Sequence, residues 1–393
     1  MTEGVTLPPD PSRPAGAASP VRVIPTDDPG RKPEPGTALC LSGGGYRAMV
    51  FHIGALWRLH EGGLLSTLKR ISCVSGGSIT GAMLAIKWTK VIGAGRDVFV
   101  HEIVTPLREL AGKTIDIRSA ASGIFLPGRA SDHVASAYDR HLFKGRTLQD
   151  IPDEPRFIFN ATNIQTGALW RFMKPYMADY RVGRINRPDV LLAKAVAASS
   201  AFPPFLSPAE LSLSAGIVQP IAGADLNKPP FTTKAILTDG GVYDNLGLET
   251  AWKRYDTILV SNGGGKLAPE ESPSSDWPRH AYRVLDLIDN QVRSLRVRQL
   301  IDSYKAPAAD AAHRKGTYWG IRTDIDDYGL NDALSCPLAR TTELAQIPTR
   351  LKAMDNVLQE RLINWGYAVC DAALRKHFNP ALRQGNFPYN RGV

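Results

Sequence analysis

The sequence predicts an α/β protein of three layers, α/β/α, with helices on both faces of a mostly parallel central sheet. Apolar strands alternate with amphipathic helices between residues 37 and 90, and this strand–helix–strand–helix order is typical of parallel sheets. Three of the predicted strands end in glycine, serine or aspartate. Open α/β sheets place their ligands at such strand ends, so we expect the functional site there.

The predicted elements follow from apolar spacing and from the residues that stop helices and strands. The expected strands cover residues 37–41, 70–74, 157–163, 169–173, 235–239, 257–261 and 317–322. The expected helices cover residues 46–60, 77–90, 97–111, 131–143, 190–200, 246–255, 282–304 and 351–377. Gln-Thr-Gly at 165–167 separates two strands and predicts a hairpin.

Two regions flank the predicted catalytic domain of residues 37–265. Residues 1–36 are rich in proline and lack apolar periodicity, which predicts a disordered tail. Residues 266–393 are predicted to form a mainly helical extension packed on the catalytic domain. Its basic helix at 282–304 has most of its apolar residues on one side. That side is expected to pack on the core, with binding to a membrane surface or a partner as the alternative.

The amino-acid composition limits the classes of protein to which the chain can belong. The chain has 393 residues, of which 43% are hydrophobic and 22% charged, so a sizeable core is expected. No apolar run reaches the roughly 18 to 20 residues that span a bilayer, and we see no signal peptide, so we expect a cytoplasmic protein. The four cysteines are scattered and are expected to be reduced. Without a Cys-x-x-Cys or His-Glu-x-x-His pattern, no metal and no other cofactor is expected.

The net charge of +9 is compatible with nucleic acid, with an anionic membrane surface, or with solubility alone. No basic run is interleaved with aromatic residues, so we do not expect nucleic acid as a partner. A positive face favours binding to anionic lipid headgroups. We therefore expect transient, peripheral association with the membrane surface.

A candidate nucleophile lies in residues 70–84, which read as a strand, a sharp turn at Ser75 and a helix that starts near Gly77. This geometry is that of a nucleophile elbow, and the helix N-terminus favours negative charge. The pattern Gly-x-Ser-x-Gly is only partly met, because Cys73 stands at the first glycine position. A plain N-cap and turn is the alternative explanation. Other nearby serines are Ser42, Ser72 and Ser78.

Two further motifs accompany this serine. A glycine loop at residues 43–48 follows the first strand, and Asp-Gly-Gly at 239–241 ends another. In the order glycine loop, serine, aspartate, the motifs resemble those of the patatin-like phospholipases, which have G-x-G-x-x-G/A, G-x-S-x-G and D-G-G/A. The resemblance covers about residues 37–264, and residues 197–204 also look like the family's helix end before the aspartate.

The resemblance implies a patatin-like fold and a Ser–Asp dyad without histidine, with Ser75 as nucleophile and Asp239 as general base. Burial in an apolar cleft would raise the pKa of Asp239 and make it a better proton acceptor. Asp244 is the rival carboxylate, and a simple Asp-Gly turn is the alternative for Asp239. By the same resemblance, the oxyanion hole is formed by Gly43, Gly44 and Gly45.

Two other polar residues lie close to the glycine loop. Arg47 is expected to bind a substrate phosphate, with bracing of the loop as an equal alternative. His52 is expected to be structural, and none of the eight histidines lies in a strand-end motif after Asp239.

We therefore expect a phospholipase A type lipid acyl hydrolase that cleaves acyl esters of glycerophospholipids through an acyl-enzyme on Ser75. One alternative is a conditionally activated membrane-targeting effector or signalling module on the same fold. Another is an acyltransferase.

Overall fold

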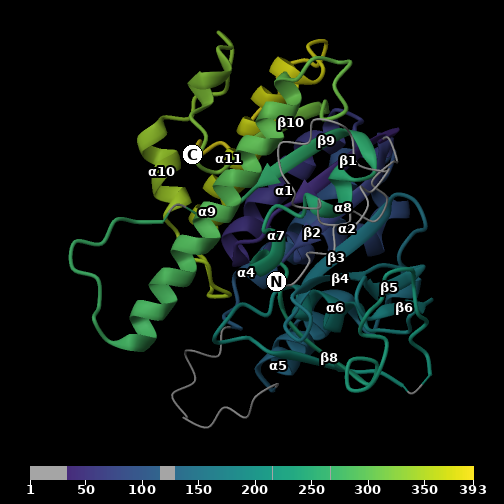
Figure 1. The fold of residues 1–393 in the computed structure, drawn as a ribbon. Coiled ribbons are helices and arrows are strands. Elements are labelled where there is room, and N and C mark those ends of the chain that lie inside the picture. Colours follow the sequence, from purple (N-terminus) through teal and green to yellow (C-terminus); the bar gives the residue numbers. More distant parts are fainter. Residues whose placement is uncertain (1–32, 116–128, 215, 266) are drawn as a thin grey trace, which may run out of the picture.

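The computed structural model describes residues 33–115, 129–214, 216–265 and 267–393 (Figure 1). A ten-stranded sheet runs through it, and eight of its strands lie in the order β10-β9-β1-β2-β3-β4-β5-β6. Neighbouring strands from β10 to β3 are parallel. They are β10 (Lys315–Gly320), β9 (Tyr255–Asn262), β1 (Glu34–Leu41), β2 (Leu68–Val74) and β3 (Arg156–Asn163). The predicted α/β fold with a mostly parallel central sheet is confirmed.

Beyond β3 the sheet becomes antiparallel. These strands are β4 (Ala168–Phe172), β5 (Tyr176–Asp179) and β6 (Gly183–Asn186). The predicted hairpin is confirmed, because β3 and β4 pair antiparallel across residues 164–167. β8 (Lys234–Asp239) also pairs antiparallel with β3, and β7 (Ala209–Ser212) pairs with β8. The short strands β5, β6 and β7 were not expected.

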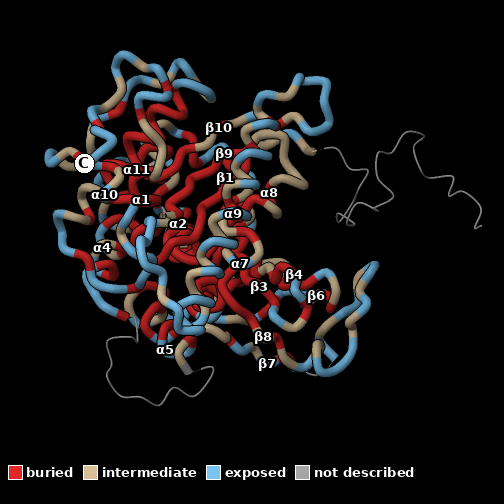
Figure 2. Tube along the Cα trace, turned by 60° about the vertical axis from the view of Figure 1, so that its left-hand side comes forward, coloured by how far each residue is buried: buried red, intermediate tan, exposed pale blue. Residues whose placement is uncertain are grey.

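Helices cover both faces of the sheet. On one face, α1 (Gly45–Glu61), α2 (Gly76–Val91) and α11 (Asn356–His377) share a core with Leu39 and Leu41 of β1. On the other face, α8 (Glu249–Trp252) and α9 (Trp277–Lys305) share a smaller core with Ala38 and Cys40. Successive side chains of a strand point to opposite faces, so β1 is apolar on both sides. Figure 2 shows the buried residues along the strands and the helices next to them.

Six further helices complete the helical layers, and among them α10 packs on α11. They are α3 (Arg96–Phe99), α4 (Thr105–Ala111), α5 (Arg129–Tyr138), α6 (Leu192–Ser199), α7 (Gly241–Asp244) and α10 (Leu338–Ala345). π-helical turns at Val100–Val104 and Asp139–Phe143 extend the helices beside them. The predicted helix at 246–255 is wrong in extent: Gly247 has a φ of +68°, and only Glu249–Trp252 is helical before β9 begins.

The C-terminal region belongs to the same fold. β10 extends the sheet beside β9, and α11 crosses α1 so closely that glycines are required at the contact. A Cβ on Gly366 would lie 1.9 Å from the carbonyl oxygen of Phe51, and one on Gly54 would lie 1.9 Å from that of Ile363. The extension therefore supplies an edge strand and part of a helical layer.

Two boundaries differ from expectation. Residues 34–36 were assigned to the tail but begin β1, with Glu34 opposite Tyr255; the tail predicted for residues 1–32 lies outside the described residues. The predicted helix at 282–304 begins earlier, at Trp277, where the Asp276 side chain accepts a hydrogen bond from the amide of Arg279. Within the described ranges, no helix combines the length and apolar character needed to cross a membrane.

Candidate active site

The register of the sheet brings the C-terminal ends of β2 and β8 together. β2 runs parallel to β3, with Val74 opposite Asn160. β8 runs antiparallel to β3, with Asp239 opposite Ala161. The two strands therefore approach each other head-on along one edge of β3. Ser75, which directly follows β2, comes next to Asp239.

Ser75 forms the sharp turn between β2 and α2. Its φ of 50° and ψ of −119° lie in a region that residues with a Cβ rarely adopt, and such strain clusters at functional sites. A Cβ on Gly76 would lie 2.1 Å from the carbonyl oxygen of Gly45, and one on Gly77 would lie 2.4 Å from that of Leu41. The two residues after Ser75 must therefore be glycine for the turn to pack against the glycine loop.

Cys73, which departs from the family pattern, is accommodated within this turn. Its side chain is fully buried, and burial raises the pKa of its thiol well above the usual range. A Cβ on Gly81 of α2 would lie only 2.3 Å from the Cys73 sulfur. Gly81 thus leaves room for a side chain at position 73, and the sharp turn at Ser75 still forms.

Ser199 stabilises the turn at Ser75 through hydrogen bonds. The amide of Ser75 donates to Ser199 Oγ at 3.0 Å, and the Ser199 hydroxyl donates to the carbonyl oxygen of Asn160 at 2.6 Å. Ser78 Oγ lies 2.7 Å from the same hydroxyl. Sequence reasoning assigned no role to Ser199, although it lies at the end of α6 within the segment that resembles the family.

Asp239 is 2% exposed. Its Oδ1 accepts the amide hydrogen of Gly241 at 2.7 Å. Among the described residues, Oδ2 has no hydrogen-bond partner of normal geometry. Burial, reinforced by the charge of Asp289, raises the pKa of Asp239 to about 7, while the Gly241 amide and the nearby Ser75 hydroxyl oppose the rise. A carboxylate with this pKa is a suitable general base near neutral pH.

The glycine loop passes directly against Ser75. A Cβ on Gly43 would lie 3.1 Å from the Cβ of Ser75. The amide of Gly43 donates to the carbonyl oxygen of Asn245 at 3.0 Å, so it is engaged in this conformation. In the part of the chain that the structure describes, the amides of Gly44 and Gly45 donate no hydrogen bond. The described protein groups therefore leave these two amides unengaged.

Asn245 links the glycine loop to the Asp-Gly-Gly turn. Besides accepting the amide hydrogen of Gly43, it places its side-chain Oδ1 where a Cβ on Gly43 or Gly241 would lie within 2.9 Å of it. Nothing in the motif pattern indicated this role. It becomes visible only once the two loops are seen to meet.

Arg47 braces the loop in this structure. Its side chain is 2% exposed, and its nitrogens donate to the carbonyl oxygens of Gly263 and Ile347 and to Thr349 Oγ1. Burial, with Arg293 and Arg322 nearby, lowers the pKa of Arg47 to about 9. The expected contact with a substrate phosphate is not supported by this geometry, because the guanidinium is turned into the protein. These contacts match the alternative expectation, in which Arg47 braces the glycine loop.

The rival carboxylate, Asp244, accepts hydrogen bonds from backbone amides. Its oxygens accept the amides of Leu246 at 3.2 Å and Glu249 at 2.7 Å, and Arg296 Nε lies 3.7 Å away. Burial raises the pKa of Asp244, although Arg296 opposes the rise. Asp244 therefore shapes the chain after the Asp-Gly-Gly turn.

The other candidate side chains also form hydrogen bonds within the core. His52 lies between Ser261 Oγ, at 2.8 Å from Nδ1, and the carbonyl oxygen of Ser42, at 2.9 Å from Nε2. Burial lowers the pKa of His52 to about 4, which fits the expected structural role. Three fully buried serines each hydrogen-bond to other protein groups: Ser42, Ser72 and Ser78.

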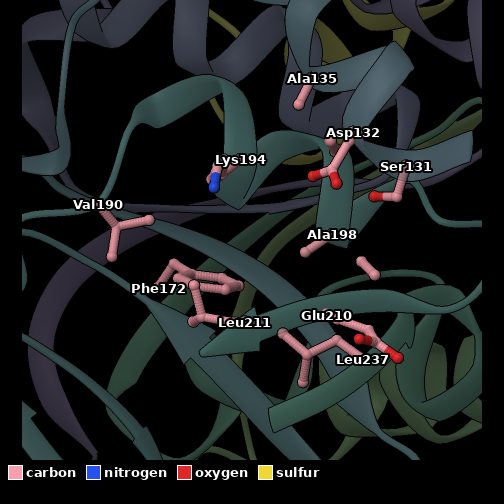
Figure 3. Close-up of a pocket in the computed structure, with 12 residues that line it drawn as sticks. Ser131, Asp132, Ala135, Phe172, Val190, Lys194, Ala198, Glu210, Leu211 and Leu237 are labelled. Atoms are coloured by element: carbon pink, nitrogen blue, oxygen red, sulfur yellow. The ribbon is translucent and has the colours of Figure 1, made fainter. Parts of the chain in front are cut away.

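A cavity lies between α5, α6, β7 and β8 (Figure 3). Leu237 lines it, two residues before Asp239 on the same strand, together with apolar Phe172 and charged Lys194. Neither Ser75 nor Asp239 lines this cavity. Within the described residues, no group of three or more His, Cys, Asp or Glu side chains is placed to hold a metal ion.

The fold and the site define an α/β protein with a serine–aspartate pair where two strands meet. Residues 39–252 match the family model of the patatin-like phospholipases. This match covers more than half of the chain, so the chain belongs to the patatin-like phospholipase family, a family of lipid hydrolases.

Among solved structures, human GIVD cytosolic phospholipase A2 matches with a TM-score of 0.51 and 15% identity, covering 85% of this chain and 60% of that one. Its complex with methyl gamma-linolenyl fluorophosphonate matches with a TM-score of 0.51 and 16% identity, covering 86% and 57%. These similarities establish the shared fold, and the chain spans about 60% of the length of the first. No curated protein matches the chain.

Proposed function

We propose that the protein hydrolyses acyl esters of glycerophospholipids, as a phospholipase A, with Ser75 as nucleophile and Asp239 as general base. The observation that carries the proposal is the strand register, which places Ser75 beside a buried carboxylate. Membership of the patatin-like phospholipase family supports a lipid as the substrate.

In the acylation step, the Ser75 hydroxyl transfers its proton to Asp239 as Oγ attacks the ester carbonyl carbon. The resulting oxyanion accepts hydrogen bonds from Gly44 and Gly45, whose amides are not otherwise engaged. α1 and α2 begin at Gly45 and Gly76, so two positive helix ends also face the developing charge. Protonated Asp239 then gives its proton to the leaving lysophospholipid alkoxide as the ester C–O bond breaks.

Deacylation repeats the sequence with water. Asp239 accepts a proton from a water molecule whose oxygen attacks the acyl carbon bound to Ser75. The tetrahedral intermediate collapses with release of the fatty acid, and the proton on Asp239 returns to Ser75 Oγ. An acyltransferase would use the same pair with an alcohol in place of water.

The test is release of fatty acid from mixed phospholipid vesicles by the wild type and by Ser75→Ala and Asp239→Asn. We expect each variant to lose activity by about 10²-fold or more, the scale typical of catalytic nucleophiles and bases. Asp153→Asn, whose side chain is 77% exposed, is the matched control and should keep full activity. Thermal unfolding checks that every variant is folded.

Retention of activity in either folded variant would overturn the assignment of the pair. A wild type that is silent on all lipids would contradict constitutive hydrolysis and favour the conditionally activated alternative. Addition of a short alcohol distinguishes transfer from hydrolysis, because a transferase would form the new ester in preference to free fatty acid.

A further inference from the structure

The helix α9 carries an exposed apolar stripe. Trp277 is 81% exposed, and Leu285, Ile288 and Leu295 are each more than half exposed. The stripe, as defined here, comprises Trp277, Val284, Leu285, Ile288, Val292 and Leu295. It extends over about 27 Å at the helical rise of 1.5 Å per residue. Contiguous exposed apolar surface of this kind marks an interaction site.

The opposite side of α9 fixes the helix to the protein body. Arg293 Nη2 donates to the carbonyl oxygen of Gly265 at 3.0 Å, and Tyr304 donates to that of Ile258 at 2.7 Å. Leu300 is fully buried against β1 and β9. Figure 1 shows that the N-terminal half of α9 projects beyond the body. The stripe is thus held in a defined orientation.

α9 also lies next to the candidate active site. The Tyr282 ring of α9 contacts the rings of Phe202 and Phe205, with centroids 6.4 and 6.2 Å apart, and Phe205 is 40% exposed. α9 also contacts α7, where Val242 is 54% exposed only three residues after Asp239. The body-facing side of α9 therefore borders the rim of the Ser75–Asp239 pair, so the stripe and the rim belong to neighbouring parts of the molecule.

The charge on α9 indicates which kind of surface this is. The helix carries six basic and three acidic residues. Of the basic residues, Arg293 is buried and Arg296 pairs with Asp244 and Glu249. Arg279 and Arg298 are exposed near either end of the stripe. A helix with an apolar face and basic residues lies in the headgroup region of anionic membranes. A second copy of the chain fits less well, because a strip about 27 Å by 10 Å offers far less than the roughly 800 Å² per partner of a stable dimer.

We propose that α9 is a membrane-docking helix that inserts the stripe into the surface of a bilayer containing anionic phospholipid. Docking through α9 brings the neighbouring rim, formed by Phe205 and Val242, close to the lipid surface. The inference rests on the proposed function in one respect: the docked surface is the source of the substrate.

The test measures binding apart from hydrolysis. Full-length Ser75→Ala protein is mixed with phosphatidylcholine vesicles, with or without phosphatidylserine, and the bound fraction is measured by flotation. We expect stronger binding to the anionic vesicles and at least a tenfold weaker partition when Leu285→Ser and Ile288→Ser are added. The control pair Leu338→Ser and Val357→Ser, at positions 48% and 45% exposed on α10 and α11, should leave partition unchanged.

A second measurement separates this inference from the proposed function. With Ser75 intact, the Leu285→Ser and Ile288→Ser protein should lose vesicle hydrolysis but keep its rate on a monomeric, soluble ester. If the wild type hydrolyses neither substrate, the proposed function fails, and flotation still decides the docking inference. Unchanged partition of the stripe variant would overturn the docking inference. So would a wild-type dimer, seen by light scattering, that the stripe substitutions convert to monomer.

Discussion

Asp239 combines two properties that oppose each other in a folded protein. It is nearly fully buried, and the proposed mechanism requires it to be ionised when it accepts a proton from Ser75. The hydrogen bond from the Gly241 amide offsets part of the cost of burying the charge, and the pKa of Asp239 remains near 7. Such a residue favours function at the expense of stability.

The raised pKa of Asp239 makes the reaction pH-dependent. Because only the ionised carboxylate accepts the proton of Ser75, we expect kcat/KM on a soluble ester to rise with pH through an apparent pKa near 7 and then to level off. A rate that stayed constant between about pH 5 and pH 8 would contradict the role of Asp239 as base.

The same shift affects stability. The folded pKa lies above the unfolded value of about 3.9, so the contribution of this group to stability is present at low pH and is lost as pH rises toward 7. Asp239→Asn stays neutral, so between about pH 4.5 and pH 8 we expect it to gain about 3 kcal/mol relative to wild type. Urea unfolding of both proteins measures the difference. Parallel pH profiles would contradict the assignment.

Sequence alone allowed Ser75 and Asp239 to be proposed, because each lies in a contiguous motif at a strand end. Ser199 and Asn245 could not be found in this way. Ser199 acts on Ser75 across 124 residues of sequence, and Asn245 acts by filling the space between two loops. The role of Arg47 also depended on distant residues, since its acceptors Ile347 and Thr349 lie about 300 residues away.

At the scale of elements, the crossing of α1 and α11 joins the C-terminal extension to the helix that begins at the glycine loop. The helices touch through backbone at Gly54 and Gly366. Residues between α10 and α11 reach the loop itself, because Tyr46 donates its amide hydrogen to the carbonyl oxygen of Arg350 at 3.0 Å. The extension thus helps to fix where α1 begins.

Gly366→Ala tests this crossing. The new methyl group would overlap the carbonyl oxygen of Phe51, so α1 and α11 must separate, and we expect a loss of about 2 to 3 kcal/mol in the free energy of unfolding. Gly95→Ala is the control, because a Cβ there meets nothing within 4 Å at an ordinary φ of −74°. Equal stability of the two variants in chemical unfolding would contradict the close crossing.

Long, strongly periodic elements were predictable, and α1, α2, β2 and β3 lie close to their expected positions. The strands β5, β6 and β7 were missed because four or so residues carry too little periodicity to be recognised. The apolar side of α9 was expected to pack on the core, and this is wrong for Leu285, Ile288 and Leu295, which are exposed. The alternative of a binding surface had been kept, because an apolar helix face looks the same in sequence whether it packs on the core or faces outward.

At the scale of the whole molecule, the site depends on a change of direction within one sheet. Parallel strands bring Ser75 to the edge, and the antiparallel entry of β8 brings Asp239 to meet it. Ser75 and Asp239 are only 5% and 2% exposed, so the pair lies beneath the surface where α7, α9 and the end of α6 converge. The architecture explains how motifs from three parts of the chain form one site.

The most direct test of this account is covalent labelling with a long-chain alkyl fluorophosphonate, which phosphonylates an activated serine. Peptide mapping by mass spectrometry should place one adduct on Ser75, with none there in Ser75→Ala and labelling at least about 10²-fold slower in Asp239→Asn. An adduct on another serine, or undiminished labelling of the Asp239→Asn protein, would contradict the central claim that Ser75 and Asp239 act as a catalytic pair.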